Sequence, residues 1–244
     1  MMKIELTQKP KNPTIIEGFP GFGLVATIAT EFLVKHLNAV KIGQIWDSKL
    51  LPMAAIHDSC ILDPLGIYYC KKHNIVLVHA LSNIKTMEWD IADSLIKLSS
   101  QLNAKEVISL EGVGSQEGKL RTFYYTDDKS KKIKLEKIGL LPLKEGIIMG
   151  VTGALLLKRP PKISCIFVES QMGLADSKAA AKIIQVLDNY LGLKVDTAPL
   201  LKAAAQFEDK IKGVFKKGKM AMMQRDQKNK PMEHLSTGAP NYFG

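Results

Sequence analysis

Short apolar segments alternate with helical patterns along most of the chain. The apolar and β-branched segments include residues 14–19 (TIIEGF), 74–80 (NIVLVHA) and 105–113 (KEVISLEGV). Between them, residues 24–38 and 87–102 repeat apolar positions at the three- and four-residue spacing of one helix face. Strands that alternate with helices in this way predict an α/β fold.

The composition of the strands indicates how the sheet is arranged. Residues 75–80 (IVLVHA) and 165–170 (CIFVES) are apolar nearly throughout, as in strands that are covered on both faces. Residues 121–127 are more polar and are typical of a strand at an edge. We therefore predict a mixed, mostly parallel sheet flanked by helices.

The C-terminal part of the pattern is helical and then loses its period. Residues 176–191 begin with Asp176, keep an apolar stripe and stop before Gly192, which predicts a helix. A second helix is expected from Pro199, with proline in its first turn. From about residue 218 no period remains, so we predict one domain over residues 1–217 and a flexible basic tail over residues 218–244.

Composition places the chain among ordinary globular proteins. Its 244 residues are 46% hydrophobic and 24% charged. We find no N-terminal leader, and every apolar segment is far shorter than the roughly 20 residues that a membrane span needs. We therefore expect a cytoplasmic protein without a membrane partner.

Half of the net charge of +10 lies near the C-terminus, where residues 208–230 hold eight basic and three acidic side chains. Phe215 is the only aromatic residue among them, and the segment matches no nucleic-acid recognition module. We expect a solvated tail and no nucleic-acid binding. The lysines can instead steer the protein toward an acidic protein surface, an effect that salt would weaken.

Metal, disulfide and cofactor chemistry are not indicated. Cys60, Cys70 and Cys165 are scattered and form no C-x-x-C pair, so we expect buried, reduced thiols. The five histidines include no H-E-x-x-H pair. We expect neither a metal nor a cofactor.

The segment EGFPGFGLVATIA (residues 17–29) joins a predicted strand to a predicted helix. Gly21, Gly23 and Ala26 fit the dinucleotide pattern G-x-G-x-x-A, which also requires an acid after the next strand, and Asp47 stands at about the right distance. The other interpretation, which we favour, is a tight strand-to-helix turn in which glycine lets the backbone pack closely.

Two glutamates follow apolar strands at places where α/β folds carry site residues. Glu111 and Glu169 can line a pocket together with the loop that contains Gly18, Pro20, Gly21 and Gly23. Carboxylates at strand ends also often accept hydrogen bonds from the backbone of neighbouring loops. Sequence alone leaves a pocket and a structural loop as alternatives.

The segment IIEGFPGFGLVATIATEFLVKHL, followed by LLPMAAIHD, NIVLVHA, VTGALLL and DSKAAAKIIQVLDNYLGLKVDTAPLLKAA, resembles the proteasome assembly chaperone family in its archaeal form. The resemblance covers most of residues 13–217. It implies a fold related to nucleoside phosphorylases, without established catalysis. It also implies self-association into a homo-oligomer or pairing with a second family member.

The family also implies a role for the last residues. Members that dock on the proteasome end in a hydrophobic residue, a tyrosine and any final residue, which insert between α-ring subunits. In this chain Tyr242 takes the hydrophobic place, Phe243 the tyrosine place and Gly244 the last place. Phe243 lacks the phenolic hydroxyl, so a hydrogen bond worth about 0.5–1.5 kcal/mol is lost. Alternatively, these residues fold back on the protein or bind nothing.

The leading hypothesis is a non-enzymatic proteasome assembly chaperone or adaptor whose tail engages proteasome α-subunits. The alternative is a small-molecule or nucleotide-binding enzyme of nucleoside-phosphorylase ancestry that uses the glycine loop with Glu111 or Glu169.

Overall fold

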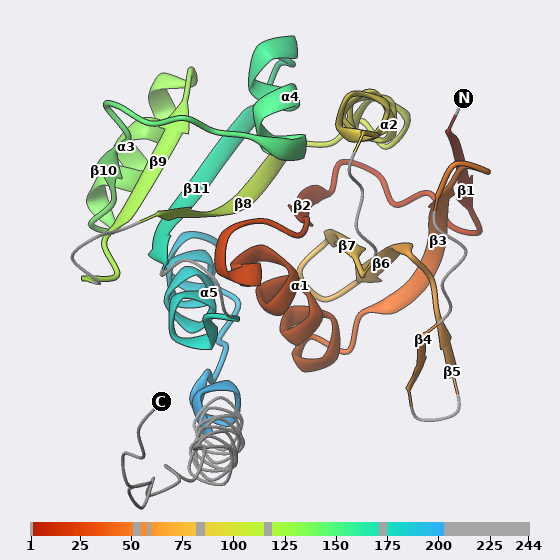
Figure 1. Cartoon of the computed structure of the whole chain (residues 1–244), viewed down its shortest axis with the longest axis horizontal. Helices are drawn as coiled ribbons and strands as arrows, with labels where there is room; N and C mark the ends of the chain where they lie inside the picture. The colour runs from red at the N-terminus through yellow and green to blue at the C-terminus, as the bar shows by residue number, and fades with distance from the viewer. Residues whose placement is uncertain are drawn as a thin grey trace, which may run out of the picture. The chain divides into compact units, whose positions relative to one another are not determined.

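The computed structural model describes residues 2–50, 55–57, 60–81, 86–114, 119–170 and 175–202. Its contacts divide the chain after Leu201, and the elements below belong to the unit that ends there. The centre of this unit is a nine-stranded sheet (Figure 1). In spatial order its strands are β1 (Lys3–Leu6), β3 (Val40–Trp46), β6 (Leu65–Cys70), β7 (Ile75–Ala80), β2 (Thr14–Gly18), β8 (Glu106–Gly114), β11 (Ile163–Ser170), β9 (Thr122–Thr126) and β10 (Leu141–Pro142). A separate antiparallel pair consists of β4 (Ala55–His57) and β5 (Cys60–Leu62).

The sheet is mixed, as predicted, but it is less parallel than predicted. Of its eight described pairings, four are parallel: β2 with β7, β2 with β8, β8 with β11 and β9 with β10. The other four are antiparallel. The turn from Cys70 to Ile75 explains part of this difference, because so short a connection returns the chain antiparallel, whereas a parallel neighbour requires a long crossover.

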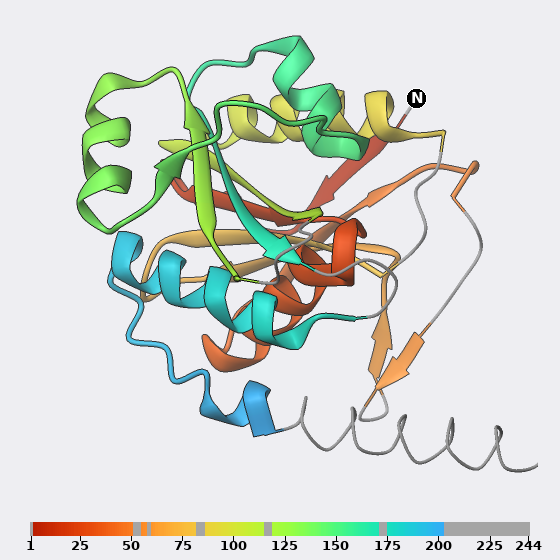
Figure 2. The ribbon, with the colours of Figure 1, turned by 60° about the vertical axis from the view of Figure 1, so that its left-hand side comes forward.

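Helices cover both faces of the sheet (Figures 1 and 2). On one face α1 (Val25–His36) packs against α5 (Ser177–Leu191), and on the other α2 (Glu88–Gln101) packs against α4 (Gly150–Lys158). The short α3 (Lys129–Lys137) packs on β9 and β10. Among the described helices, none is long and apolar enough to cross a membrane.

Two hydrophobic cores result, one on each face of the sheet. Successive side chains of a strand point to opposite faces, so Ile15 enters the core under α2 and α4 while Ile16 enters the core under α1 and α5. Phe167 and Ile166 divide in the same way. This double coverage explains why the central strands are apolar nearly throughout.

The predicted helix 176–191 corresponds to α5. The Asp176 carboxylate accepts a hydrogen bond from the Ala179 N–H at 2.9 Å, and Gly192 ends the helix in the left-handed region with φ of 67°. Residues 198–202 are helical, as expected near Pro199. The rest of that predicted helix, the boundary after residue 217 and the tail 218–244 lie outside the described residues.

The predicted edge strand is not at the edge. Thr122–Thr126 forms β9, which lies between β11 and the two-residue β10. The extra pairing comes from Leu141 and Pro142, whose segment is too short to give a strand pattern in the sequence.

Candidate functional site

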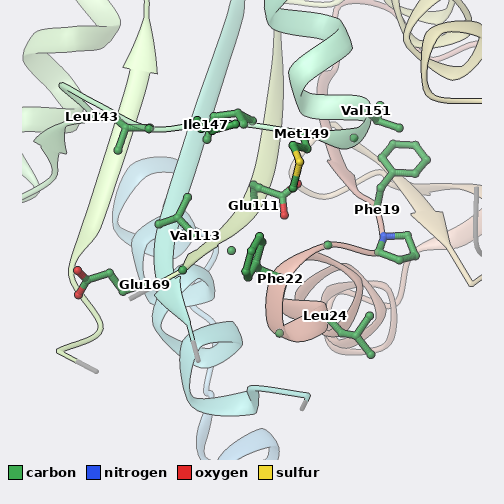
Figure 3. A pocket seen from close by; sticks show the side chains of 18 of the residues that line it. Phe19, Phe22, Leu24, Glu111, Val113, Leu143, Ile147, Met149, Val151 and Glu169 are labelled. Atoms are coloured by element: carbon green, nitrogen blue, oxygen red, sulfur yellow. The ribbon is translucent and has the colours of Figure 1, made fainter. Parts of the chain in front are cut away.

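A pocket of about 1370 Å³ opens where the parallel strands β2, β8 and β11 end (Figure 3). The loop after β2 and the ends of β8 and β11 form one side. The segment 145–151, which leads into α4, forms another. The carboxyl ends of parallel strands are where open α/β sheets bind ligands, so this is the candidate site.

The structure places five of the six predicted pocket residues on this wall: Pro20, Gly21, Gly23, Glu111 and Glu169. Gly18 lies just before the loop, at the end of β2, and is not on the wall. Tyr242, Phe243 and Gly244 lie outside the described residues.

Close packing explains the glycines of the loop. A Cβ atom at Gly18 would lie 2.6 Å from Cγ2 of Thr30 and 2.8 Å from the carbonyl carbon of Ala26 on α1. A Cβ atom at Gly21 would overlap the Glu111 carboxylate. Gly23 has φ of 61°, a left-handed conformation that favours glycine.

The dinucleotide fingerprint does not describe this loop. Its acid, Asp47, follows β3, and β3 is separated from β2 by β6 and β7. The Asp47 carboxylate instead accepts a hydrogen bond from the Lys49 N–H at 3.0 Å. The next strand along the chain therefore does not bring its acid to the glycine loop.

Glu111 is the carboxyl group that points into the pocket, between Phe22 and Met149 (Figure 3). Burial raises its pKa to about 7. The hydroxyl of Thr152 donates a hydrogen bond to Oε2 of Glu111 at 3.3 Å. This bond and the N–H groups of Gly112 and Phe22 act to lower the pKa. A carboxyl with this pKa exists in both protonation states near neutral pH.

A second carboxyl lies behind the pocket, inside the core. Glu17 on β2 is fully buried, and neither carboxyl oxygen has a hydrogen-bond partner among the described residues. The pKa of Glu17 is raised to about 8, chiefly by burial. The nearby Ser109 hydroxyl acts to lower it and the Glu111 carboxyl acts to raise it. Ser109 is itself 2.9 Å from the Thr152 hydroxyl, which contacts Glu111. No motif in the sequence marks Glu17.

Glu169 is held by Arg121. Its carboxylate accepts hydrogen bonds from Nε of Arg121 at 2.9 Å and from the Arg121 backbone N–H at 3.0 Å, and Nη2 of Arg121 lies at 2.7 Å. In Figure 3 this carboxylate is turned away from Glu111. Glu169 thus accepts a hydrogen bond from a neighbouring backbone N–H, which is the second role considered for carboxylates at strand ends.

The rest of the wall is apolar and acidic. Among its described residues none is Lys, Arg or His, while Glu88 and Glu145 add two more carboxyl groups. The larger apolar side chains are Phe19, Phe22, Leu24, Val113, Phe123, Leu143, Ile147, Ile148, Met149 and Val151. Ile147 and Met149 are 88% and 66% exposed. Residues 145–151 were not predicted to line a pocket, because no motif marks them.

Other chemistry-bearing residues lie elsewhere. His79 is buried beside α1, with Nδ1 2.9 Å from the Thr30 hydroxyl, and burial lowers its pKa to about 4. Cys70 and Cys165 are buried free thiols. Within the described part of the chain, no three His, Cys, Asp or Glu side chains gather as a metal site would require.

Comparison with known proteins identifies the family. The model of the PAC2 family matches residues 15–214. The chain belongs to the PAC2 family. A crystal structure of PbaA from Pyrococcus furiosus, described as an archaeal homolog of proteasome-assembly chaperone, is 30% identical, with a TM-score of 0.80 over 92% of this chain and 97% of that one.

Two further relatives cover nearly the whole chain. An uncharacterized protein of Methanocaldococcus jannaschii is 28% identical over 91% of this chain and 93% of its own length. PbaB of P. furiosus, described as an archaeal proteasome activator, shares the fold, with a TM-score of 0.72 at 23% identity over 87% of this chain and 98% of that one. The two P. furiosus structures share the mixed α/β architecture described above.

Proposed function

We propose that this PAC2 protein is a proteasome assembly chaperone or proteasome-binding adaptor that works as a homo-oligomer or with a second family member. The observation that carries the proposal is the similarity to PbaA over nearly the full length of both chains, at 30% identity. Membership of the PAC2 family over residues 15–214 supports it.

In this proposal the contact with proteasome α-subunits is made by Tyr242, Phe243 and Gly244. A terminal carboxylate is a charged group that a basic or amide-lined site recognises, and the two aromatic side chains bury a large area at low entropic cost. An oligomeric body would present several such ends to a ring of equivalent pockets. The high effective concentration then multiplies a weak individual contact.

The test is co-sedimentation of the full chain with proteasome α-rings. Deleting residues 242–244 is expected to abolish it. Phe243→Tyr restores the hydroxyl that docking family members have, and is expected to tighten binding about 2- to 12-fold, the equivalent of one neutral hydrogen bond. Adding one residue after Gly244 keeps a carboxylate but displaces it, and should weaken binding. Retention of the deletion variant on the rings would refute tail docking.

The alternative function, a small-molecule or nucleotide-binding enzyme, has one observation in its favour, the pocket beside the glycine loop. A thermal-shift screen with nucleosides and nucleotides tests it. Stabilisation that Gly23→Trp removes would favour this alternative, whereas no stabilisation by any of them would count against it.

A further inference from the structure

We propose that the pocket at the ends of β2, β8 and β11 binds a small amphipathic cation, an ammonium or guanidinium group carried on an apolar or aromatic body. This inference is independent of the proposed docking on the proteasome. It differs from nucleotide binding in the charge that the pocket accepts.

The charges of the wall support a cation. Its described residues include four carboxyl groups and no basic side chain. Arg121 already pairs with Glu169, and Glu145 is exposed at the rim. Glu88 lies half-buried in the first turn of α2. Glu111 is the carboxyl group that Figure 3 shows inside the pocket, between Phe22 and Met149. A phosphate group would face this carboxylate, and like charges in a partly desolvated site repel each other.

The apolar surface supports a body attached to the cation. Phe22 and Phe123 are half-buried and offer aromatic surface, and aromatic faces attract cations as well as apolar groups. At the mouth, Ile147 and Met149 are 88% and 66% exposed, so water contacts apolar surface that a bound ligand would cover. A volume of about 1370 Å³ leaves room for more than a bare ammonium ion.

The surroundings of Glu111 make its charge responsive to such a ligand. The groups that face it are the Thr152 hydroxyl on α4, the N–H groups of Gly112 and Phe22, the Glu17 carboxyl on β2 and the Cys165 thiol on β11. A bound cation stabilises the ionised carboxylate. Since the pKa of Glu111 is about 7, binding is expected to release a proton and to tighten about tenfold from about pH 6 to pH 8.

Three probes of similar shape and different charge test the proposal on the full chain: phenethylammonium, phenethyl alcohol and hydrocinnamate. Titration calorimetry is expected to rank their affinities in that order. Glu111→Gln keeps the size of the side chain and removes its charge, so phenethylammonium should lose about tenfold or more in affinity while the alcohol is unaffected. Glu5→Gln removes an exposed carboxyl of β1 that does not line the pocket, so it is the matched control and should change little.

The same ammonium group could come from a free amine or from a lysine side chain of a protein. An N-acetylated, C-amidated Phe-Lys dipeptide separates these sources, because tighter binding of the dipeptide than of phenethylammonium assigns the pocket to a protein side chain. The deletion of residues 242–244 should leave all these affinities unchanged, which keeps this test separate from that of proteasome docking.

Three results would overturn the proposal. One is equal affinity of wild type for the ammonium and the alcohol, or no ammonium binding at millimolar concentration. Another is unchanged ammonium affinity in Glu111→Gln. The third, which does not depend on any variant folding, is an ammonium affinity of wild type that stays constant or falls as the pH rises through 7.

Discussion

Glu17→Gln should change how the stability of this protein depends on pH. Glu17 is fully buried, and its pKa is raised from 4.5 to about 8 in the folded chain. Below about pH 4.5 both the folded and the unfolded chain hold the proton. Between that pH and about 8 only the folded chain holds it, so the wild type loses stability as the pH rises.

The size of this loss follows from the two pKa values. Each pH unit between them removes about 1.4 kcal/mol from the free energy of unfolding, which gives about 3.4 kcal/mol by pH 7 and about 4.4 kcal/mol by pH 8, where half of the folded chains are ionised at Glu17. Glutamine cannot ionise, so the variant escapes this loss. The difference in stability between variant and wild type should therefore move in favour of the variant by about 1.4 kcal/mol per pH unit.

Urea unfolding of both proteins at several pH values from about 4.5 to 8 measures this slope. The amide group that Glu17→Gln introduces adds an offset of either sign, but that offset does not depend on pH, and Glu111 titrates in both proteins. Glu145→Gln removes an exposed carboxyl and should show no comparable slope. A stability difference between Glu17→Gln and wild type that stays constant with pH would refute the reasoning.

Two further predictions concern the fold. Gly18→Ala places a Cβ atom 2.6 Å from Thr30 Cγ2 and should destabilise the protein by about 3 kcal/mol, which lowers the melting temperature by roughly 6–12 °C. Gly114→Ala is the control, because its Cβ atom meets its first neighbour at 3.6 Å. This variant should melt within about 2 °C of wild type. Equal melting of the two variants would contradict the packing role of Gly18. Asp176→Ala removes the cap of α5 and should lower the free energy of unfolding in denaturant by about 1–2 kcal/mol. Asp176→Asn should recover most of this loss. An alanine variant as stable as wild type would exclude the capping role of Asp176.

Much of the fold could be predicted because the central strands are buried on both faces. β2, β7, β8 and β11 stand out as apolar segments, and the amphipathic stripe and cap signals of α5 place its ends correctly. The antiparallel half of the sheet was harder to predict. Strand direction depends on which strands become neighbours, and the local pattern does not record that.

Two helices gave no amphipathic signal. In α3 only Leu135 is buried, so its residues lack an apolar stripe and its start is marked only by Asp128, whose carboxylate accepts from the N–H groups of Ser130 and Lys131. In α4 nearly every residue before Lys158 is small or apolar, so no polar face reveals a helical period.

The candidate site was predicted in part for a similar reason. Glu111 and the glycine loop carry a local signal, since both follow apolar strands. Residues 145–151 reach the pocket only through the path of the chain from β10 to α4, which depends on tertiary packing. The burial of Glu17 likewise follows from the coverage of β2 by α4 and its neighbours. A single carboxylate in an apolar segment does not show in the sequence that it is buried.

The position of β2 has a consequence for the order of events during synthesis. Thr14–Gly18 is made early, yet its two partners in the sheet are Ile75–Ala80 and Glu106–Gly114. At about 5–20 residues per second, the ribosome needs roughly 5–20 s to deliver the second partner after the first strand is complete. Until Gly114 has emerged, the β8 side of β2 has no partner strand, so we expect the nascent chain to need protection from aggregation during that interval.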